Sequence, residues 1–455
     1  MQKSLIYLCL LCLLDLGTAQ AQHLALSPDK KYLVNQTTGQ PFFITGEAAW
    51  SLLVQLNNAD ALAYLQDRAN KGYNAIIVNL IEHEYGDTEC SAGRGNNAGD
   101  CPFTGAPFAT PNEAYFAHAD YVIQEAERLG ITVFLYPTYS GYECNAEGWC
   151  ADIQAASVTT MSHWGTYVAN RYKSFSNIFW IIGGDIDPGS YGIKDKLNTV
   201  AVAIRAADPN HLMSAHGRPA EAALDIWTGF PWLDTNTEYI ESTITAPMAF
   251  TQYQRRDFLP FYLTEDYYEG EYSTTAKQLR TESYTAVLSG AYLGAFFGNN
   301  PIWCFQEKHA AILTCDAKPS WQSQLNSLGS ISHSWFGKLF RSREHWKLVP
   351  DIKHTVVTAG YGSGADLTTT ARTSDGQSIL SFIPNGNDTV LTVNMAKITD
   401  VGGKARVWWF NPATGAVVDG GKLPNRGMHR FTAPGAQDWV LVLDSAAAQF
   451  PPPGR

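Results

Sequence analysis

Apolar and polar positions alternate along this chain with two different periods. Between Pro41 and about Phe340, short apolar runs are separated by longer stretches whose apolar residues recur at helical spacing. The stretch from Glu113 to Leu129 shows this spacing and stops at Gly130, a common helix terminator. The runs that predict strands are 42–46, 75–80, 131–136, 178–184, 212–217, 232–239, 261–266 and 295–303.

Eight strand–helix units in succession predict a (β/α)8 TIM barrel, which we expect to span residues 22–348. A doubly wound open sheet would show the same alternation. That alternative is disfavoured because the chain lacks the Gly-x-Gly-x-x-Gly and Walker loops that hold nucleotides in such folds.

After about Pro350 the period shortens. Runs such as SILSFIP and DWVLVLD alternate apolar with polar residues and are separated by Gly, Asn, Asp and Pro. This pattern predicts an antiparallel β-sandwich over residues 349–447. Trp408 and Trp409 are adjacent, so on a strand one could face the barrel and the other the interior of the sandwich. The Pro-rich segment 448–455 is expected to be disordered.

The first 21 residues have the features of a secretory signal peptide. Lys3 precedes the apolar run LIYLCLLCLL, and small residues end at Ala21, which is the expected cleavage point. The apolar run is too short to span a bilayer, and no later run approaches about 20 apolar residues. We therefore expect a secreted or periplasmic protein without a membrane span.

Six cysteines lie beyond this segment, an even number that suggests disulfides in an exported protein. Pairing near neighbours predicts the bonds Cys90–Cys101, Cys144–Cys150 and Cys304–Cys315, although six cysteines allow 15 connectivities. The chain beyond the signal has no Cys-x-x-Cys and no His-Glu-x-x-His spacing, so we expect no metal centre.

The charge balance argues against one class of partner. The formal net charge is −11, and no basic run or stripe is present, so we expect no nucleic-acid ligand. The chain is rich in aromatic residues, with 13 Trp, 22 Tyr and 21 Phe. Most must pack in cores, but some could line a groove for sugar rings, whose C–H faces stack on aromatic rings.

Carboxylates follow several predicted strands, at the barrel face where active sites form. The fourth strand runs through Gly183 and Gly184 into Asp185, and the seventh ends at Glu265. Hydrolysis of a glycosidic bond needs two carboxyl groups, one to protonate the leaving oxygen and one to attack or stabilise the sugar cation. Either residue could instead serve only as a cap of the following turn.

Other side chains at predicted strand ends could contact the substrate. We single out Glu47, Trp50, Asn79, Tyr136, His216, Tyr239 and Trp303 as candidate substrate-binding residues. A lone histidine such as His216 is more often a structural hydrogen-bonding residue than a ligand contact. The strand ends carry no Gly-x-Ser-x-Gly element, which argues against an esterase of the α/β-hydrolase type.

Several of these motifs resemble the apiosidase-like glycoside hydrolases. The resemblance covers roughly residues 23–340, and the distal β region resembles the collagen-binding-type sandwich that usually follows in that family. The motifs that carry it are GEAAW (46–50), FWIIGGD (179–185), SAHGRP (214–219), EDYYE (265–269) and FFGNNPIW (296–303).

The resemblance implies a (β/α)8 barrel with Asp185 as acid/base and Glu265 as nucleophile, acting with retention and without a cofactor. It also implies a carbohydrate substrate, such as a side chain of pectin, although Glu47 stands where the family commonly has Asp. The alternative is a non-catalytic carbohydrate-binding or adhesion protein on a barrel scaffold. The sequence leaves the oligomeric state open.

Overall fold

The eight predicted barrel strands form one parallel sheet that nearly closes on itself. The computed structural model describes residues 23–240, 245–305, 319–386 and 389–455. The sheet order is β10-β9-β8-β5-β4-β13-β12-β11, and its end strands β10 and β11 lie in contact. The strands are β4 (Ile44–Ala48), β5 (Ala75–Asn79), β8 (Thr132–Tyr136), β9 (Ile178–Gly183), β10 (Met213–His216), β11 (Asn236–Tyr239), β12 (Phe261–Glu265) and β13 (Gly294–Phe297).

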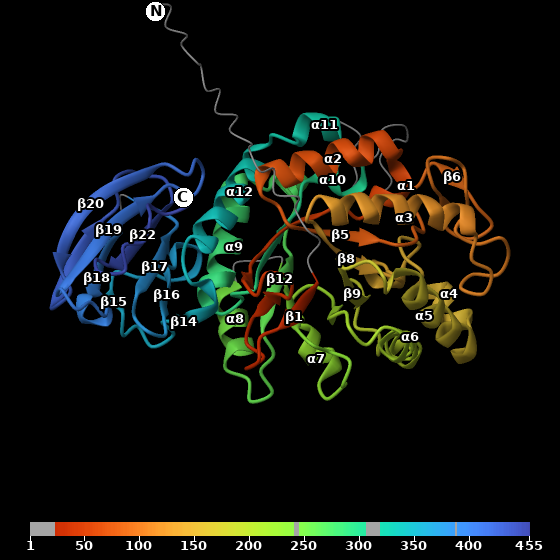
Figure 1. Cartoon of the computed structure of the whole chain (residues 1–455), viewed down its shortest axis with the longest axis horizontal. Coiled ribbons are helices and arrows are strands. Elements are labelled where there is room, and N and C mark those ends of the chain that lie inside the picture. Colours follow the sequence, from red (N-terminus) through yellow and green to blue (C-terminus); the bar gives the residue numbers. More distant parts are fainter. Residues whose placement is uncertain (1–22, 241–244, 306–318, 387–388) are drawn as a thin grey trace, which may run out of the picture.

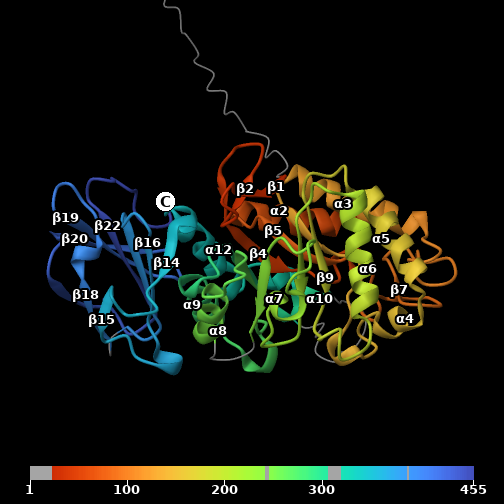
Figure 2. The same ribbon diagram turned by 90° about the horizontal axis from the view of Figure 1, so that it is seen from below.

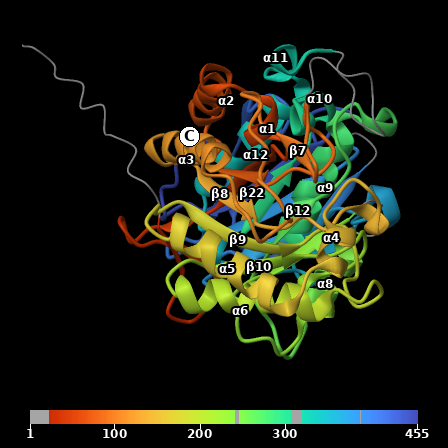
Figure 3. The same ribbon diagram turned by 90° about the vertical axis from the view of Figure 1, so that its right-hand side faces the viewer.

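A helix follows each strand and packs outside the sheet, so the predicted TIM-barrel class is confirmed. Figure 3 shows α2, α3, α5, α6 and α8 around the strands. The main helices are α2 (Asn58–Lys71), α3 (Glu113–Arg128), α5 (Val158–Tyr172), α6 (Lys194–Ala207), α7 (Ala223–Trp227), α8 (Thr245–Tyr253), α9 (Ala276–Ser289) and α12 (Leu328–Arg341). Short helices α1 (Leu52–Gln55), α4 (Cys150–Ala155), α10 (Asn300–Cys304) and α11 (Trp321–Gln324) lie in the loops.

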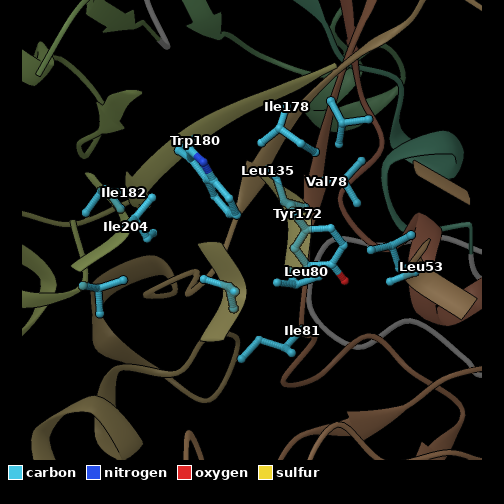
Figure 4. Packing of buried hydrophobic residues seen from close by; sticks show 14 of the residues in the cluster. Leu53, Val78, Leu80, Ile81, Leu135, Tyr172, Ile178, Trp180, Ile182 and Ile204 are labelled. Carbon is cyan, nitrogen blue, oxygen red and sulfur yellow. The ribbon is translucent and has the colours of Figure 1, made fainter. Parts of the chain in front are cut away.

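Strand β9 shows why these runs are apolar throughout. All six of its residues are buried, because one face meets the helices and the other faces the barrel interior. Ile178, Trp180 and Ile182 pack outward with Tyr172 of α5 (Figure 4). Phe179 points inward and stacks on Phe134, with ring centroids 4.4 Å apart. The interior is thus filled by side chains, as in other barrels of this size.

The predicted eighth strand is too long at its C-terminal end. Residues 295–303 were expected to form one strand, but β13 ends at Phe297 and Asn300–Cys304 forms helix α10. Pro301 explains the change, because proline suits the first turn of a helix and cannot donate to a sheet ladder.

Small sheets decorate the barrel. Strands β1 (Leu24–Leu26), β2 (Leu33–Asn35) and β3 (Pro41–Phe42) form an antiparallel sheet before it. Strands β6 (Thr88–Glu89) and β7 (Arg94–Gly95) form a hairpin in the loop after β5. The predicted disulfides Cys90–Cys101 and Cys144–Cys150 are present and close the loops after β5 and β8. Cys315 lies outside the described residues, so the pair Cys304–Cys315 stays a prediction, as does the signal peptide at residues 1–21.

The C-terminal region is an antiparallel β-sandwich. One sheet has the order β14-β16-β17-β22-β19-β20 and the other β15-β18-β21. The strands are β14 (Leu348–Pro350), β15 (Val357–Ala359), β16 (Thr369–Thr373), β17 (Ser378–Ile383), β18 (Val390–Asn394), β19 (Lys404–Phe410), β20 (Val417–Pro424), β21 (Met428–Thr432) and β22 (Trp439–Ser445). Short 3-10 turns at 142–144, 271–273, 345–347, 364–366 and 395–397 complete the described secondary structure.

The larger sheet of the sandwich packs against the barrel helices α9 and α12 (Figures 1 and 2). Trp408 joins the cluster shared with Phe336 and Phe340 of α12, whereas Trp409 joins the interior of the sandwich. The two adjacent rings thus serve the two cores, as their alternation along β19 requires. No helix among the described residues is both long and apolar enough to cross a membrane.

The C-terminal segment 448–455 is packed rather than disordered, which corrects the expectation from its composition. Gly454 N–H donates to Ser342 Oγ at 2.9 Å, and the Arg343 guanidinium donates to the Pro451 carbonyl at 3.0 Å. The guanidinium of Arg455 lies 5.7 Å from the centre of the Trp335 ring. The segment is therefore held by hydrogen bonds and a cation–π contact to residues in and just after α12.

Arg343 also forms a buried ion pair between the two domains, and this pair predicts a stability effect. Its guanidinium lies 2.7 Å from Asp444 of β22, and neither side chain is more than 2% exposed. Replacing Arg343 with Ala should lower the free energy of unfolding by about 3–5 kcal/mol, because it leaves the Asp444 charge buried without its partner. Denaturant unfolding of the two proteins measures this difference.

The matched control is Arg128→Ala at the end of α3. Arg128 pairs with Glu125, but its side chain is 56% exposed. Its removal should change the free energy of unfolding by no more than about 0.5 kcal/mol. Equal effects of the two variants would contradict the role assigned to the Arg343–Asp444 pair.

Candidate active site

The end of β9 turns sharply because two glycines occupy it. Gly183 and Gly184 have φ of 95° and 133°, in a region that favours glycine. A Cβ on Gly183 would lie 2.7 Å from the His216 carbonyl oxygen, and one on Gly184 would lie 2.4 Å from the Tyr139 ring. The glycines therefore let the strand end fit between β10 and the loop after β8, which brings Asp185 to the barrel mouth.

Asp185 is held by a tyrosine from the neighbouring loop. Its backbone has φ of 42°, an uncommon value for a residue with a side chain. The Tyr139 hydroxyl donates to Asp185 Oδ2 at 2.6 Å. The Asp185 residue is only 9% exposed. An uncommon backbone conformation at a buried carboxyl group is typical of functional sites, where the surrounding structure maintains it.

Glu265, the last residue of β12, has an equivalent arrangement. The Tyr268 hydroxyl donates to Glu265 Oε1 at 2.6 Å, and the indole N–H of Trp50 donates to the same hydroxyl oxygen at 2.7 Å. Trp50 follows β4, so a segment more than 200 residues away in the chain helps to fix this carboxyl group. Hydrogen bonds donated to a carboxylate favour its ionised form.

His216 lies between the two carboxyl groups. Its Nε2 is 3.2 Å from Glu265 Oε2 and 3.5 Å from Asp185 Oδ1. Its Nδ1 lies 3.1 Å from the Tyr136 hydroxyl. We assign the proton of the neutral ring to Nε2, because that nitrogen faces two acceptors while Nδ1 can accept from Tyr136. Burial lowers the pKa of His216 to about 3.

The three groups are close enough to act together. One oxygen from Asp185, one from Glu265 and one His216 nitrogen all lie within 4.8 Å of one another. A histidine and two carboxylates can also ligate a divalent cation, and this is the only such cluster found among the described residues.

A pocket of about 480 Å³ opens above these carboxyl groups. Of the candidate residues, Trp50, Asn79, Asp185, Tyr239, Glu265 and Trp303 line it. Tyr136 and His216 are not in its lining but lie beneath it, in contact with each other and, through His216, with the carboxyl groups. The other lining residues are Tyr85, Tyr139, Tyr142, Glu143, Asn145, Glu147, Tyr268, Glu271 and Tyr272.

Glu47 is absent from the pocket lining, in contrast to the expectation that it binds substrate. Its carboxylate accepts hydrogen bonds from Tyr64 at 2.6 Å and from Arg68 at 2.9 Å, and it is fully buried. Both partners belong to α2, so Glu47 faces outward from β4 toward the helix layer. Side chains alternate along a strand, and Glu47 lies on the outer face.

The loop closed by Cys144–Cys150 forms one wall of the pocket. It supplies Asn145 and Glu147, and Tyr85 donates to Glu147 at 3.0 Å. Burial raises the pKa of Glu147, although the hydrogen bond from Tyr85 opposes this effect. Sequence reasoning predicted the disulfide of this loop but did not single out Glu147 or Tyr85. The three-residue spacing in EDYYE was the available signal for Tyr268.

Asn79 presents a polar atom at the pocket wall. Its Nδ2 donates to Glu82 Oε2 at 3.3 Å, and that oxygen also accepts from Ser51 Oγ at 3.0 Å. Within the described residues, Asn79 Oδ1 has no hydrogen-bond partner. A buried carbonyl oxygen at a pocket wall is suited to accept a hydrogen bond from a ligand hydroxyl.

Comparisons with known proteins place this geometry in context. Residues 27–347 match the family model of the apiosidase-like catalytic domain, and residues 349–444 match that of the collagen-binding domain of a collagenase. A solved structure titled glycoside hydrolase has a TM-score of 0.82 at 22% identity, covering 95% of this chain and 98% of its own. A glycoside hydrolase family 5 protein from Bacteroides vulgatus has a TM-score of 0.83 at 21% identity, covering 94% and 95%. A search of curated proteins found no match.

The close approach at Gly184 predicts a large effect of a small substitution. Gly184→Ala should lower the free energy of unfolding by about 1–3 kcal/mol, because the methyl group meets the Tyr139 ring at an unfavourable φ. Gly192→Ala is the control, since φ is 68° but nothing lies within 4 Å, and it should cost about 1 kcal/mol or less. Thermal unfolding compares the two variants, and an equal or larger loss for Gly192→Ala would contradict this reasoning.

Two histidines near the barrel mouth should have pKa values shifted in opposite directions from the ordinary value. The His216 ring should remain neutral, with its proton on Nε2, from pH 8 down to about pH 4, because burial lowers its pKa to about 3. For His83, burial lowers the pKa, but the hydrogen bonds to Asp152 and the Ala146 carbonyl outweigh it and raise the pKa above 6.5. Nitrogen-15 NMR of the imidazole rings measures both, and a His216 that gains a proton near pH 6.5 would refute the assignment.

Proposed function

Because the chain belongs to the apiosidase-like family, we propose that it is an exported, retaining glycoside hydrolase that removes sugars from polysaccharide side chains of the pectic type. One observation carries the proposal: carboxyl groups at the ends of β9 and β12 approach within 4.8 Å in a single pocket. Retaining glycosidases hold their two carboxyl groups about 5–5.5 Å apart, whereas inverting enzymes leave about 6.5–9.5 Å for a water molecule.

In this proposal Asp185 is the acid/base and Glu265 is the nucleophile. Asp185 protonates the glycosidic oxygen while Glu265 attacks the anomeric carbon, which breaks the glycosidic bond and forms a glycosyl ester. Asp185 then removes a proton from water, whose oxygen attacks the same carbon and releases Glu265 as carboxylate. Two inversions at one carbon give net retention.

The hydrogen bonds of the site suit these roles. Tyr268 and Trp50 fix Glu265 through one hydroxyl, which holds the attacking carboxylate in place. The Nε2–H of His216 faces both carboxyl groups as a neutral donor. A neutral donor lets a proton remain on Asp185 without adding a positive charge that would favour its loss.

The lining of the pocket suits a sugar ring. Trp50, Tyr239 and Trp303 provide aromatic surfaces, and Asn79 Oδ1 provides an acceptor for a hydroxyl. The loop closed by Cys144–Cys150 stands along one side of the pocket. The disulfides also fit export to an oxidising compartment, because such bonds are rare in the cytosol.

Removal of either carboxyl group tests the proposal. Asp185→Ala and Glu265→Ala should each lower kcat/KM on a cleaved oligosaccharide by at least about 1,000-fold, since each takes away one of the two groups that the reaction requires. A panel of pectic, arabinan and galactan oligosaccharides provides the substrates, and proton NMR of the first product formed reads its anomeric configuration.

Asp195→Ala provides the control, because Asp195 is an exposed carboxylate in the first turn of the helix that follows β9. It should leave kcat/KM unchanged. Full activity of either active-site variant would reject the assignment of that residue, and an inverted first product would reject double displacement. Saturable sugar binding without any released product would favour the carbohydrate-binding alternative.

A further inference from the structure

A second hollow adjoins the pocket at Asp185. We call it the outer hollow; it measures about 660 Å³. Tyr142, Glu143 and Asp185 line both cavities, whereas Glu265 lines the pocket alone. The remaining lining residues of the outer hollow are Ile186, Asp187, Ser190, Tyr191, Arg218, Pro219, Ala220 and Glu221.

This arrangement gives the two cavities different places in the reaction. The nucleophile must reach the anomeric carbon, so the sugar that is transferred occupies the pocket with Glu265. The acid/base must reach the oxygen that joins this sugar to the rest of the substrate. Because Asp185 lies where the two cavities meet, the chain beyond that oxygen extends into the outer hollow.

The outer hollow is acidic. Apart from Asp185, its described lining residues include Glu143, Asp187 and Glu221 but only one basic residue, Arg218. The Arg218 guanidinium lies 2.8 Å from Glu221 and is therefore already paired. Asp187 stays ionised, because hydrogen bonds from Ser190 and the Gly189 N–H outweigh its partial burial and lower its pKa. The lining thus carries about two net negative charges near neutral pH.

An acidic cavity disfavours a second carboxylate. A uronate placed there would be repelled by the charges of Glu143 and Asp187, whereas a neutral sugar would not. Tyr142, which is 45% exposed, and Tyr191 offer ring surfaces on which a neutral sugar can lie.

We propose that the leaving group occupies the outer hollow and that this hollow selects a neutral sugar over a uronate. The inference rests on the function proposed above and narrows it. The sugars removed would be attached to neutral chains, of the arabinan or galactan kind, and not directly to a galacturonate backbone.

Transfer to an acceptor tests the outer hollow directly. In a retaining enzyme, a sugar hydroxyl can replace water: its oxygen bonds to the anomeric carbon, its proton passes to Asp185, and the bond to Glu265 breaks. The donor is a 4-nitrophenyl glycoside that the wild-type protein hydrolyses. The acceptors are the methyl glycoside of galacturonic acid as the free acid and the same compound as its methyl ester, which differ in charge.

At low ionic strength, the ester should yield about fivefold more transfer product than the free acid. This ratio corresponds to the repulsion of the galacturonate carboxylate by the charges of Glu143 and Asp187, acting through water over roughly 8 Å. High salt should bring this ratio toward one, because it screens exposed charges. Glu143→Gln should reduce the ratio about twofold. Asp419→Asn removes the same charge from the sandwich and should leave the ratio unchanged. Mass spectrometry quantifies the products.

The possible outcomes separate this inference from the proposed function. Three results would overturn the inference while the donor is still hydrolysed: equal transfer to both acceptors, a preference for the free acid, or transfer to neither. Each of these results leaves the proposed hydrolase function standing. Failure to hydrolyse any aryl glycoside or oligosaccharide removes the proposed function and the inference together.

Discussion

The barrel mouth is organised around the cost of holding two carboxyl groups close together away from bulk water. At less than 5 Å, like charges of this kind strongly oppose each other's ionisation. The structure meets this constraint with one neutral donor between the groups, His216, and with one tyrosine hydroxyl on each. Under the roles proposed above, one group keeps a proton while the other is ionised, which avoids two like charges at this distance.

The framework behind the site exists to maintain this arrangement. The glycines at the end of β9 allow Tyr139 to approach, and Tyr139 in turn holds Asp185. Trp50, which follows β4, fixes Tyr268 and through it Glu265. The sandwich contributes from a distance, because its larger sheet covers α9 and α12 and is tied to them by the buried pairs Arg343–Asp444 and Arg280–Asp438.

Much of this architecture was predictable because strand ends carry both the fold and the site. The apolar runs identified all eight strands, and the residues at or just beyond the strand ends included both carboxyl groups. Prediction failed where the direction of a side chain mattered. Glu47 lies near a strand end but points toward α2, and the sequence alone does not reveal whether such a side chain faces the barrel interior or the helices.

Tyr85 and Glu147 were missed because they lie in long loops whose path depends on the disulfides and on packing. The tail was misjudged because its partners, Ser342 and Arg343, lie more than 100 residues away in the chain.

The Cys144–Cys150 bond places both cavities under one covalent constraint. The short loop around it carries Tyr142 and Glu143, which border both cavities, and Asn145 and Glu147, which border one. Without this bond, no covalent link would close the loop, and both cavities that meet at Asp185 have this loop in their lining. One pair of sulfur atoms therefore constrains the lining of both cavities, so that loss of this bond would alter the two together.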